Sequence, residues 1–262
     1  MLTIKEYVKP KSIEEAYELN LNKRNVIIGG MLWLKMQHKN VNTAIDISDL
    51  GLDKITETDN EYIIGAMVSL RDLELHAGLN EMTNGAVSES VKHIVGVQFR
   101  NSATVGGSIY SRFGFSDVST IFMALGAKVQ LYKAGMIPLD EFSNMKYERD
   151  ILMNVIVPKT VNKAVYLSQR NIKTDIPVLT CAVAERDGNI YCVMGSRPMK
   201  AVLIKDETGI LKNGIDESSA EKFADYVFEN TTYASNCRGS KEYREIVSKV
   251  LVKRAVLSLG EI

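Results

Sequence analysis

The 262-residue sequence contains little cysteine. Its three cysteines, Cys181, Cys192 and Cys237, are odd in number and widely spaced, and none stands in a C-x-x-C pair. This pattern argues against a disulfide framework and against an iron–sulfur cluster or a zinc site held within this chain. A protein without a disulfide framework fits a reducing compartment, and we therefore expect a cytoplasmic location.

The sequence also lacks long apolar runs and an excess of charge of either sign. No apolar stretch approaches the ~20 residues that a membrane helix needs, and the first residues show no basic segment followed by the apolar run of a secretory signal. Lys and Arg together number 32, and Asp and Glu together also number 32. A net charge of zero argues against a nucleic-acid surface and a polybasic membrane patch, so we expect neither a nucleic-acid partner nor a membrane span.

Histidine is scarce as well. His38, His76 and His93 stand apart, with no H-x-x-x-H pattern and no neighbouring Cys or Asp pattern, so we expect surface or core histidines rather than metal ligands. The sequence has no G-x-S-x-G nucleophile motif. The chemistry would then be that of a bound cofactor, with the chain supplying binding and electrostatics.

Strand and helix signals alternate in the first part of the sequence. Short apolar runs predict strands, and capping residues such as Ser12, Ser69 and Asp117 predict the starts of helices. The strands expected are residues 25–28, 43–47, 62–66, 127–132 and 151–157. The helices expected are residues 13–20, 31–37, 86–94 and 117–125, with another after Ser69. Residues 101–114 are dense in small residues and are expected to form a loop.

The pattern changes near residues 158–163, where we place a boundary between domains of residues 1–160 and 161–262. Beyond it, two apolar runs flank Asp187-Gly188, which is a strong hairpin signal. Helices are expected over residues 217–229 and 241–259. Apolar residues recur at helical spacing in the last helix, so we expect these to pack in the core: Tyr243, Ile246, Val247, Val250 and Leu251, with Ala255 and Leu257 following the spacing approximately.

Two glycine pairs stand out as candidate binding segments. They are Ile28-Gly29-Gly30-Met31-Leu32, after a strand, and Thr104-Val105-Gly106-Gly107-Ser108, in a loop that leads to a helix. Glycines at such places let backbone N–H groups approach a phosphate, and two such segments suit a pyrophosphate. The alternative is that each pair is only a tight turn. Neither segment has the pattern of a Walker A loop or of a Rossmann fingerprint.

The surrounding residues carry a resemblance to a known family. Residues 102–109, then Asp117, then residues 123–127, resemble the FAD-binding medium subunit of molybdenum hydroxylases, the group that includes xanthine dehydrogenase and carbon monoxide dehydrogenase. Residues 150–158 are similar to the family's strand at the end of the flavin domain. The final third, from Ser240 through Arg244 to Ala255, resembles the family's C-terminal domain. The resemblance covers nearly the whole chain.

The resemblance implies an α+β fold in two parts: a two-lobed FAD-binding domain of the PCMH type, followed by a smaller α+β C-terminal domain. It implies that the two glycine segments cradle the pyrophosphate of FAD and that Thr104 donates its hydroxyl to a phosphate oxygen. Asp117 would accept from a cofactor hydroxyl, and Leu152 would pack against the isoalloxazine. Arg170 would be a cation near the flavin; the alternative is a solvated surface arginine.

The sequence departs from the family pattern at three places. Met31 replaces a small polar residue or histidine, so one phosphate contact would be through the backbone alone, and Ser108 replaces the commoner asparagine. The family's small residues after the second glycine pair are replaced by the bulky stretch from Tyr110 to Ser116. Its aromatic rings either stack on the flavin or adenine or form an interface with a partner subunit.

The resemblance implies an oxidoreductase subunit that transfers electrons and does not oxidise the organic substrate alone. Electrons would leave the substrate on a molybdopterin-binding large subunit, cross an iron–sulfur subunit, reach FAD on this chain and pass to NAD or another acceptor. The alternative, favoured by Met31, Ser108 and the aromatic stretch, is a degenerate member of the family without flavin that serves as a structural assembly subunit.

Overall fold

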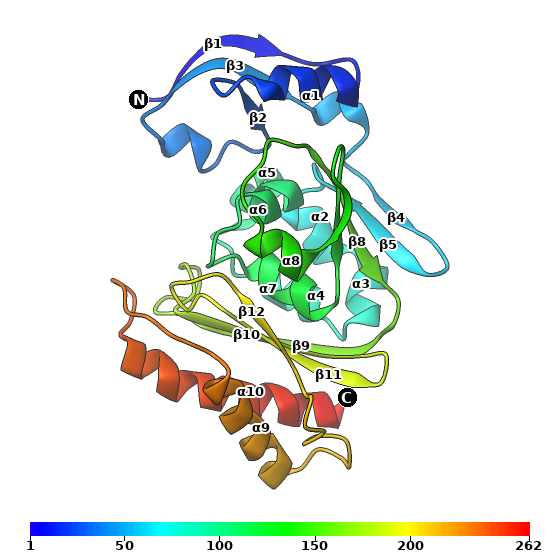
Figure 1. Cartoon of the computed structure of the whole chain (residues 1–262), viewed down its shortest axis with the longest axis vertical. Helices are drawn as coiled ribbons and strands as arrows, with labels where there is room; N and C mark the ends of the chain where they lie inside the picture. Colours follow the sequence, from blue (N-terminus) through cyan, green and yellow to red (C-terminus); the bar gives the residue numbers. More distant parts are fainter.

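The computed structural model describes residues 1–262, with Asn162 described through its backbone only. The chain stacks three units one above the other (Figure 1). A small N-terminal lobe lies at the top, a second lobe with most of the helices lies in the middle, and a sheet covered by two helices lies at the bottom.

The N-terminal lobe is a three-stranded parallel sheet with one helix. Its strand order is β1 (Thr3–Val8), β3 (Asn40–Asp46), β2 (Val26–Ile28). Helix α1 (Ile13–Leu21) begins after Ser12, whose side chain accepts from the Glu15 N–H at 3.3 Å, as predicted. The lobe's small core includes Ala16, Ile45 and Ile47 together with Ile151 of the second lobe.

The second lobe is built on a five-stranded antiparallel sheet. In spatial order its strands are β4 (Ile55–Glu57), β5 (Glu61–Gly65), β8 (Leu152–Pro158), β6 (Lys128–Leu131) and β7 (Gly135–Pro138). Short helices accompany it: α2 (Leu70–Leu75), α3 (Ala77–Met82), α4 (Ala86–Val91), α5 (Val97–Ser102), α6 (Val105–Tyr110), α7 (Asp117–Ala124) and α8 (Leu139–Asn144). Two 3₁₀ turns, η1 (Leu34–Met36) and η2 (Ser48–Leu50), lie in the connections of the N-terminal lobe.

The C-terminal unit is a four-stranded antiparallel sheet with two helices. In spatial order its strands are β12 (Val202–Lys205), β11 (Asn189–Gly195), β10 (Leu179–Arg186) and β9 (Val161–Gln169), and its helices are α9 (Glu217–Glu229) and α10 (Lys241–Glu261). The hairpin predicted at Asp187-Gly188 is confirmed. Both residues have positive φ, +50° and +68°, which matches the twist of the flanking strands.

Both faces of this four-stranded sheet are buried. Ala182, Ala184 and Val193 belong to the core of the second lobe, whereas Val183 and Cys192 belong to a core shared with α9 and α10. This alternation follows the period of two residues along a strand. The boundary at residue 160 falls between β8 and β9 and stays a prediction; the α+β class is confirmed.

Two predictions about local structure before residue 120 are wrong. Residues 101–114 are not simply a loop, because they contain the end of α5 and all of α6. Tertiary bonds stabilise α6, since the Val105 N–H donates to the Val68 carbonyl at 2.9 Å and the Gly106 N–H to the Ala66 carbonyl at 2.8 Å. Residues 31–37 form only the turn η1: Met31 has a φ of +58°, so no helix begins there, and Gln37 is already extended with a ψ of +151°.

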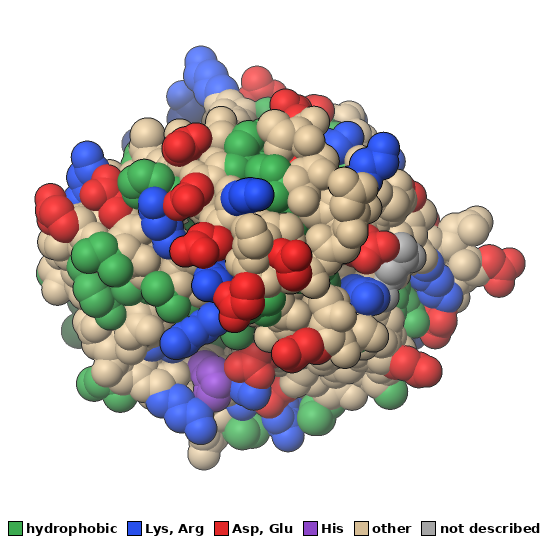
Figure 2. All heavy atoms as spheres, turned by 90° about the horizontal axis from the view of Figure 1, so that it is seen from below, with side chains coloured by type: hydrophobic (Ala, Val, Ile, Leu, Met, Phe, Trp, Pro, Cys, Tyr) green, Lys and Arg blue, Asp and Glu red, His purple; other side chains and the backbone are tan. Residues whose placement is uncertain are grey.

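The buried face of α10 also differs from the prediction. Ile246 is 68% exposed, and Tyr243 and Val250 are more than 40% exposed. Leu251 and Ala255 are buried and Val247 packs partly buried against the same core, so the prediction is correct for these residues, but the packed face also contains the polar Arg244 and Ser248. Figure 2 shows the side of the molecule that carries α9 and α10, where apolar patches lie between side chains of both charges.

Candidate functional site

One cleft of about 500 Å³ runs between the N-terminal lobe, the second lobe and the segment from Arg170 to Pro177. All but one of the predicted site residues line it: Ile28, Gly29, Gly30, Met31, Leu32, Thr104, Gly106, Gly107, Ser108, Asp117, Leu152 and Arg170. Val105 is fully buried in the core instead. The structure therefore brings the two glycine segments together, although more than 70 residues separate them in the sequence.

The first glycine pair lets the two segments touch. A Cβ on Gly30 would lie 1.8 Å from the carbonyl oxygen of Ser102, and a Cβ on Gly29 would lie 2.7 Å from Oγ1 of Thr104. Neither Gly29 nor Gly30 has a positive φ, so a left-handed turn does not explain them. Their function in the fold is close approach, because only a residue without a side chain fits there.

The first segment also presents backbone donors. Among the described residues, no group accepts from the N–H of Gly30, Met31 or Leu32. Met31 is in the left-handed region, a conformation that a residue with a side chain seldom adopts and that is common at functional sites. A run of N–H groups without protein partners beside a cleft is suited to binding an anion.

The second segment differs, because the N–H groups of Val105 to Ser108 are already bonded. The acceptors are Val68 O for Val105, Ala66 O for Gly106, Thr104 Oγ1 for Gly107 and Thr104 O for Ser108. The Ser108 hydroxyl donates to the Thr104 carbonyl at 3.0 Å. Thr104 Oγ1 accepts a hydrogen bond from the Gly107 N–H. The hydroxyl hydrogen of Thr104 is therefore still available to donate to another acceptor. This segment therefore offers shape and one hydroxyl rather than a run of free amides.

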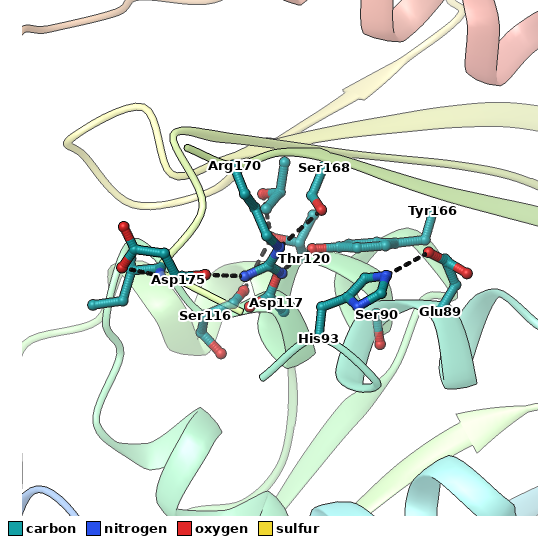
Figure 3. A network of polar contacts seen from close by, with 12 residues as sticks. Glu89, Ser90, His93, Ser116, Asp117, Thr120, Tyr166, Ser168, Arg170 and Asp175 are labelled. Atoms are coloured by element: carbon teal, nitrogen blue, oxygen red, sulfur yellow. Dashed lines mark hydrogen bonds and ion pairs between the residues drawn. The ribbon is translucent and has the colours of Figure 1, made fainter. Parts of the chain in front are cut away.

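Asp117 and Arg170 form a buried ion pair at the side of the cleft (Figure 3). The Asp117 carboxylate also accepts from the hydroxyl of Tyr166. Arg170 donates further to Ser168 Oγ at 3.1 Å and to the Asp175 carbonyl at 2.5 Å. The side chain of Arg170 is only 6% exposed, so the alternative of a solvated surface arginine is wrong.

Burial dominates the electrostatics of this pair. It raises the pKa of Asp117 to about 6, against the opposing effects of the Arg170 charge and the Tyr166 hydrogen bond. Burial, with the Asp117 charge beside it, raises the pKa of Tyr166 well above its ordinary value.

The prediction that Asp117 caps α7 is wrong by one residue. Ser116 is the N-cap and accepts from the Ser119 N–H at 3.1 Å.

Arg149 and Asp150, directly before β8, join the two lobes and line the cleft, and the sequence did not mark them as site residues. The Arg149 guanidinium donates to the carbonyl of Asn20, in the last turn of α1, and to that of Asn25, directly before β2, at 2.7 Å. The Tyr110 hydroxyl donates to the Asp150 carbonyl at 2.9 Å. No motif marks these residues, because an arginine that binds carbonyls can be identified only once the fold brings them near.

These features fit a cofactor that contains a diphosphate. The cleft has the size usual for cofactor sites, roughly 300–1,000 Å³. One wall offers free amides and one hydroxyl, and apolar residues such as Leu152 line the same cleft. The residues of the cleft therefore define a nucleotide-cofactor protein.

Comparison with known proteins identifies the family. The profile described as "FAD binding domain in molybdopterin dehydrogenase" matches residues 2–160. The chain belongs to this family of oxidoreductase subunits, and its cofactor is FAD. The cleft residues named above agree with that cofactor.

The chain is similar over almost its whole length to medium subunits of known enzymes. It is 22% identical to the nicotine 6-hydroxylase medium subunit of Paenarthrobacter nicotinovorans, over 97% of this chain and 96% of that one. It is 24% identical to the carbon monoxide dehydrogenase medium chain of Hydrogenophaga pseudoflava, over 96% and 95%. A structure of carbon monoxide dehydrogenase from Hydrogenophaga pseudoflava has a TM-score of 0.84 at 23% identity, covering 97% of this chain and 96% of that one. A structure of quinoline 2-oxidoreductase from Pseudomonas putida 86 also has a TM-score of 0.84, at 18% identity, with 98% and 96% covered. The fold is therefore that of these medium subunits.

Within the described residues, no group of three or more His, Cys, Asp or Glu side chains is arranged to hold a metal ion. None of the described helices combines the length and the apolar character needed to cross a bilayer.

Proposed function

We propose that this protein is the electron-transfer subunit of a molybdenum hydroxylase. Electrons come from iron–sulfur clusters on one partner, which receives them from a molybdopterin-binding large subunit, and they leave to NAD or another acceptor. When bound, FAD supplies the redox chemistry that links one-electron donors to a two-electron acceptor. The residues of this chain bind and orient that cofactor.

The observation that carries this proposal is the end-to-end similarity to separate medium chains. The relatives named medium subunit or medium chain align over 95–97% of this chain and 95–96% of their own length. The xanthine dehydrogenase of Emericella nidulans, by contrast, is matched over only 14% of its length. The unit that forms one part of that longer enzyme is a separate polypeptide in the relatives named medium subunit or medium chain, and the proposal takes this chain to act in the same way. The remaining chemistry then belongs to partner subunits, and the identity of the oxidised substrate is fixed on one of them.

Each cleft residue has a role in this proposal. The amides of Gly30 to Leu32 and the hydroxyl of Thr104 hold the pyrophosphate. Asp117 accepts from a cofactor hydroxyl, and Leu152 packs against the isoalloxazine. Arg170 keeps Asp117 charged and fixes the segment that ends at Pro177 as a wall of the cleft.

The test uses the full chain, purified and reconstituted with FAD in the absence of air. We expect a flavin absorption spectrum, release of FAD rather than FMN on denaturation, and no turnover of heteroaromatic or aldehyde substrates with a dye acceptor. If NAD is the acceptor, NADH should bleach the flavin absorption. Adding the partner subunits should restore substrate oxidation.

Two results separate the parts of the proposal. Substrate turnover by the lone chain would overturn the assignment as an electron-transfer subunit. If dithionite reduces the flavin but NADH does not, NAD is not the acceptor, and the other parts of the proposal are unaffected.

A further inference from the structure

Three aromatic side chains from two distant segments meet in the cofactor cleft. Trp33 follows the first glycine segment, and Phe113 and Phe115 lie between α6 and α7. The ring centroid of Trp33 lies 6.1 Å from that of Phe113 and 5.8 Å from that of Phe115. The two phenylalanine rings are stacked, with centroids 4.9 Å apart and planes 10° from parallel. All three line the cleft, and we call them the aromatic trio.

The backbone that carries the two phenylalanines is fixed from the C-terminal unit. Gly114 lies under Met199, so that a Cβ on Gly114 would come within 2.3 Å of the Met199 carbonyl oxygen. The Ser196 N–H donates to the Gly114 carbonyl at 2.8 Å. On the other side, the Ser116 hydroxyl donates to the Ser108 carbonyl at 3.0 Å, at the end of the second glycine segment. The phenylalanines are therefore held in place without any help from a ligand, which lowers the entropy lost on binding.

Two residues of the aromatic trio are exposed beside the cleft, and Phe115 is half-buried. Trp33 is 44% exposed and Phe113 is 39% exposed. Exposed aromatic faces on a fixed wall of a cofactor cleft are suited to stacking on a flat ring. FAD carries two such rings, the adenine and the isoalloxazine, one on each side of the pyrophosphate that the neighbouring glycine segments are proposed to hold.

We propose that Trp33, Phe113 and Phe115 form an aromatic subsite that stacks on a ring system of FAD. This inference rests on the proposed function, because it takes the cleft as the FAD site. The adenine and the isoalloxazine both offer a flat π surface to the trio, and binding of ADP and of FMN distinguishes the two rings. The competing explanation for these residues, an interface with a partner subunit, is one outcome of the same test.

The experiment measures binding of FAD, ADP and FMN to the full apo chain by calorimetry. The variants are Phe113→Ala and Phe113→Leu, which change a partly exposed side chain and so spare the core. Phe113→Ala should weaken FAD binding by about tenfold to a hundredfold, the range for loss of one stacked ring. Phe113→Leu should weaken it less, because it keeps apolar contact and loses only the aromatic face.

The two smaller ligands show which ring is stacked. Weaker ADP binding with unchanged FMN binding would assign the trio to the adenine, and the reverse would assign it to the isoalloxazine. Tyr243→Ala is the matched control, since Tyr243 is 41% exposed on α10 and does not line the cleft. It should leave all three affinities unchanged.

Unchanged affinity of both Phe113 variants for all three ligands would overturn the proposal, and weaker assembly with partner subunits in those same variants would assign the trio to an interface. Thermal unfolding of each variant shows whether it is folded. Failure of the wild-type chain to bind FAD would instead refute the proposed function, so the two failures are distinguishable.

Discussion

Arg170 donates to Oδ1 of Asp117 at 2.5 Å across 53 residues of sequence. The pair joins the segment after β9 to the first turn of α7, and each side chain is 6% exposed. A buried ion pair of this kind adds little over apolar packing, but loss of one partner leaves an uncompensated charge in the interior. The pair therefore ties the C-terminal unit to the wall of the cleft.

Removal of one partner of this pair should destabilise the protein strongly. Arg170→Ala leaves the Asp117 carboxylate buried without its cation, which costs roughly 3–5 kcal/mol. Urea unfolding of the full chain measures the loss. The double variant Asp117→Asn with Arg170→Ala should recover part of it, because it removes both charges. A loss below about 1 kcal/mol for Arg170→Ala would show that the pair is open to water in solution.

The same pair predicts how stability depends on pH. The pKa of Asp117 in the folded chain, about 6, lies above its ordinary value of 3.8, so between these values the folded chain binds more protons than the unfolded chain. The contribution of Asp117 to stability is thus fully present below the lower value and is lost as the pH rises through the upper one. Thermal unfolding from pH 4 to pH 7 should show wild type losing stability relative to Asp117→Asn. A constant difference would contradict the raised pKa.

Thr104 should be tested through its hydroxyl. Thr104→Ala removes both the donor proposed for the phosphate and the acceptor for the Gly107 N–H at 3.1 Å. A hydrogen bond to a charged group is worth roughly 1.5–3 kcal/mol, so FAD binding should weaken by about tenfold to a hundredfold. Thr104→Ser keeps the hydroxyl and is the control. Equal affinity of the two variants for FAD, with both folded, would reject the phosphate contact.

Gly30 should not tolerate a side chain. A Cβ there would meet the Ser102 carbonyl oxygen at 1.8 Å, so Gly30→Ala must push the two segments apart. Overpacking of this kind costs on the order of 1–3 kcal/mol, and FAD affinity should fall with it. Gly96→Ala is the control, because its Cβ would meet only Gln98 Oε1 at 3.7 Å. Thermal unfolding and flavin content measure both effects, and equal behaviour of the two variants would count against close contact of the segments.

Trp33 should report on the cofactor directly. It is the only tryptophan and it lines the cleft, so its emission should be quenched when FAD is added to the apo chain and should recover on release of the cofactor. A fluorescence titration gives the affinity at the same time. Identical emission of the apo and holo protein would place the flavin away from the loop after Gly30.

Elements with strong local signals could be predicted from the sequence. Helix α9 has the predicted bounds, and its N-cap Asp216 forms a capping box with Ser219. The hairpin at Asp187-Gly188 follows from two residues that accept positive φ. Short elements could not be predicted, since α6 has only six residues and depends on acceptors at Ala66 and Val68 that are distant in the sequence.

The candidate site shows the same division. The glycine segments could be located from the sequence, but their difference in hydrogen bonding could not, because it depends on which carbonyls the fold places beside the second segment. The sequence also leaves open whether Arg170 is buried or solvated, because only the fold brings its side chain to Asp117. For α10, the buried Arg244 donates to the carbonyls of Val178, Ala234 and Gly239, so a charged residue occupies part of the packed face and the apolar spacing identifies only some of the residues that pack.

The four-stranded sheet determines how the molecule unfolds, because the two hydrophobic cores share it. Because one side of β10 and β11 packs into the core of the second lobe and the other side into the core of α9 and α10, neither core can open without exposing the other. The chain should therefore lose its structure in one cooperative step, with amide protons in β10 and β11 among the slowest to exchange. A fragment of residues 1–160 would carry an uncovered apolar face and should aggregate when it is produced alone.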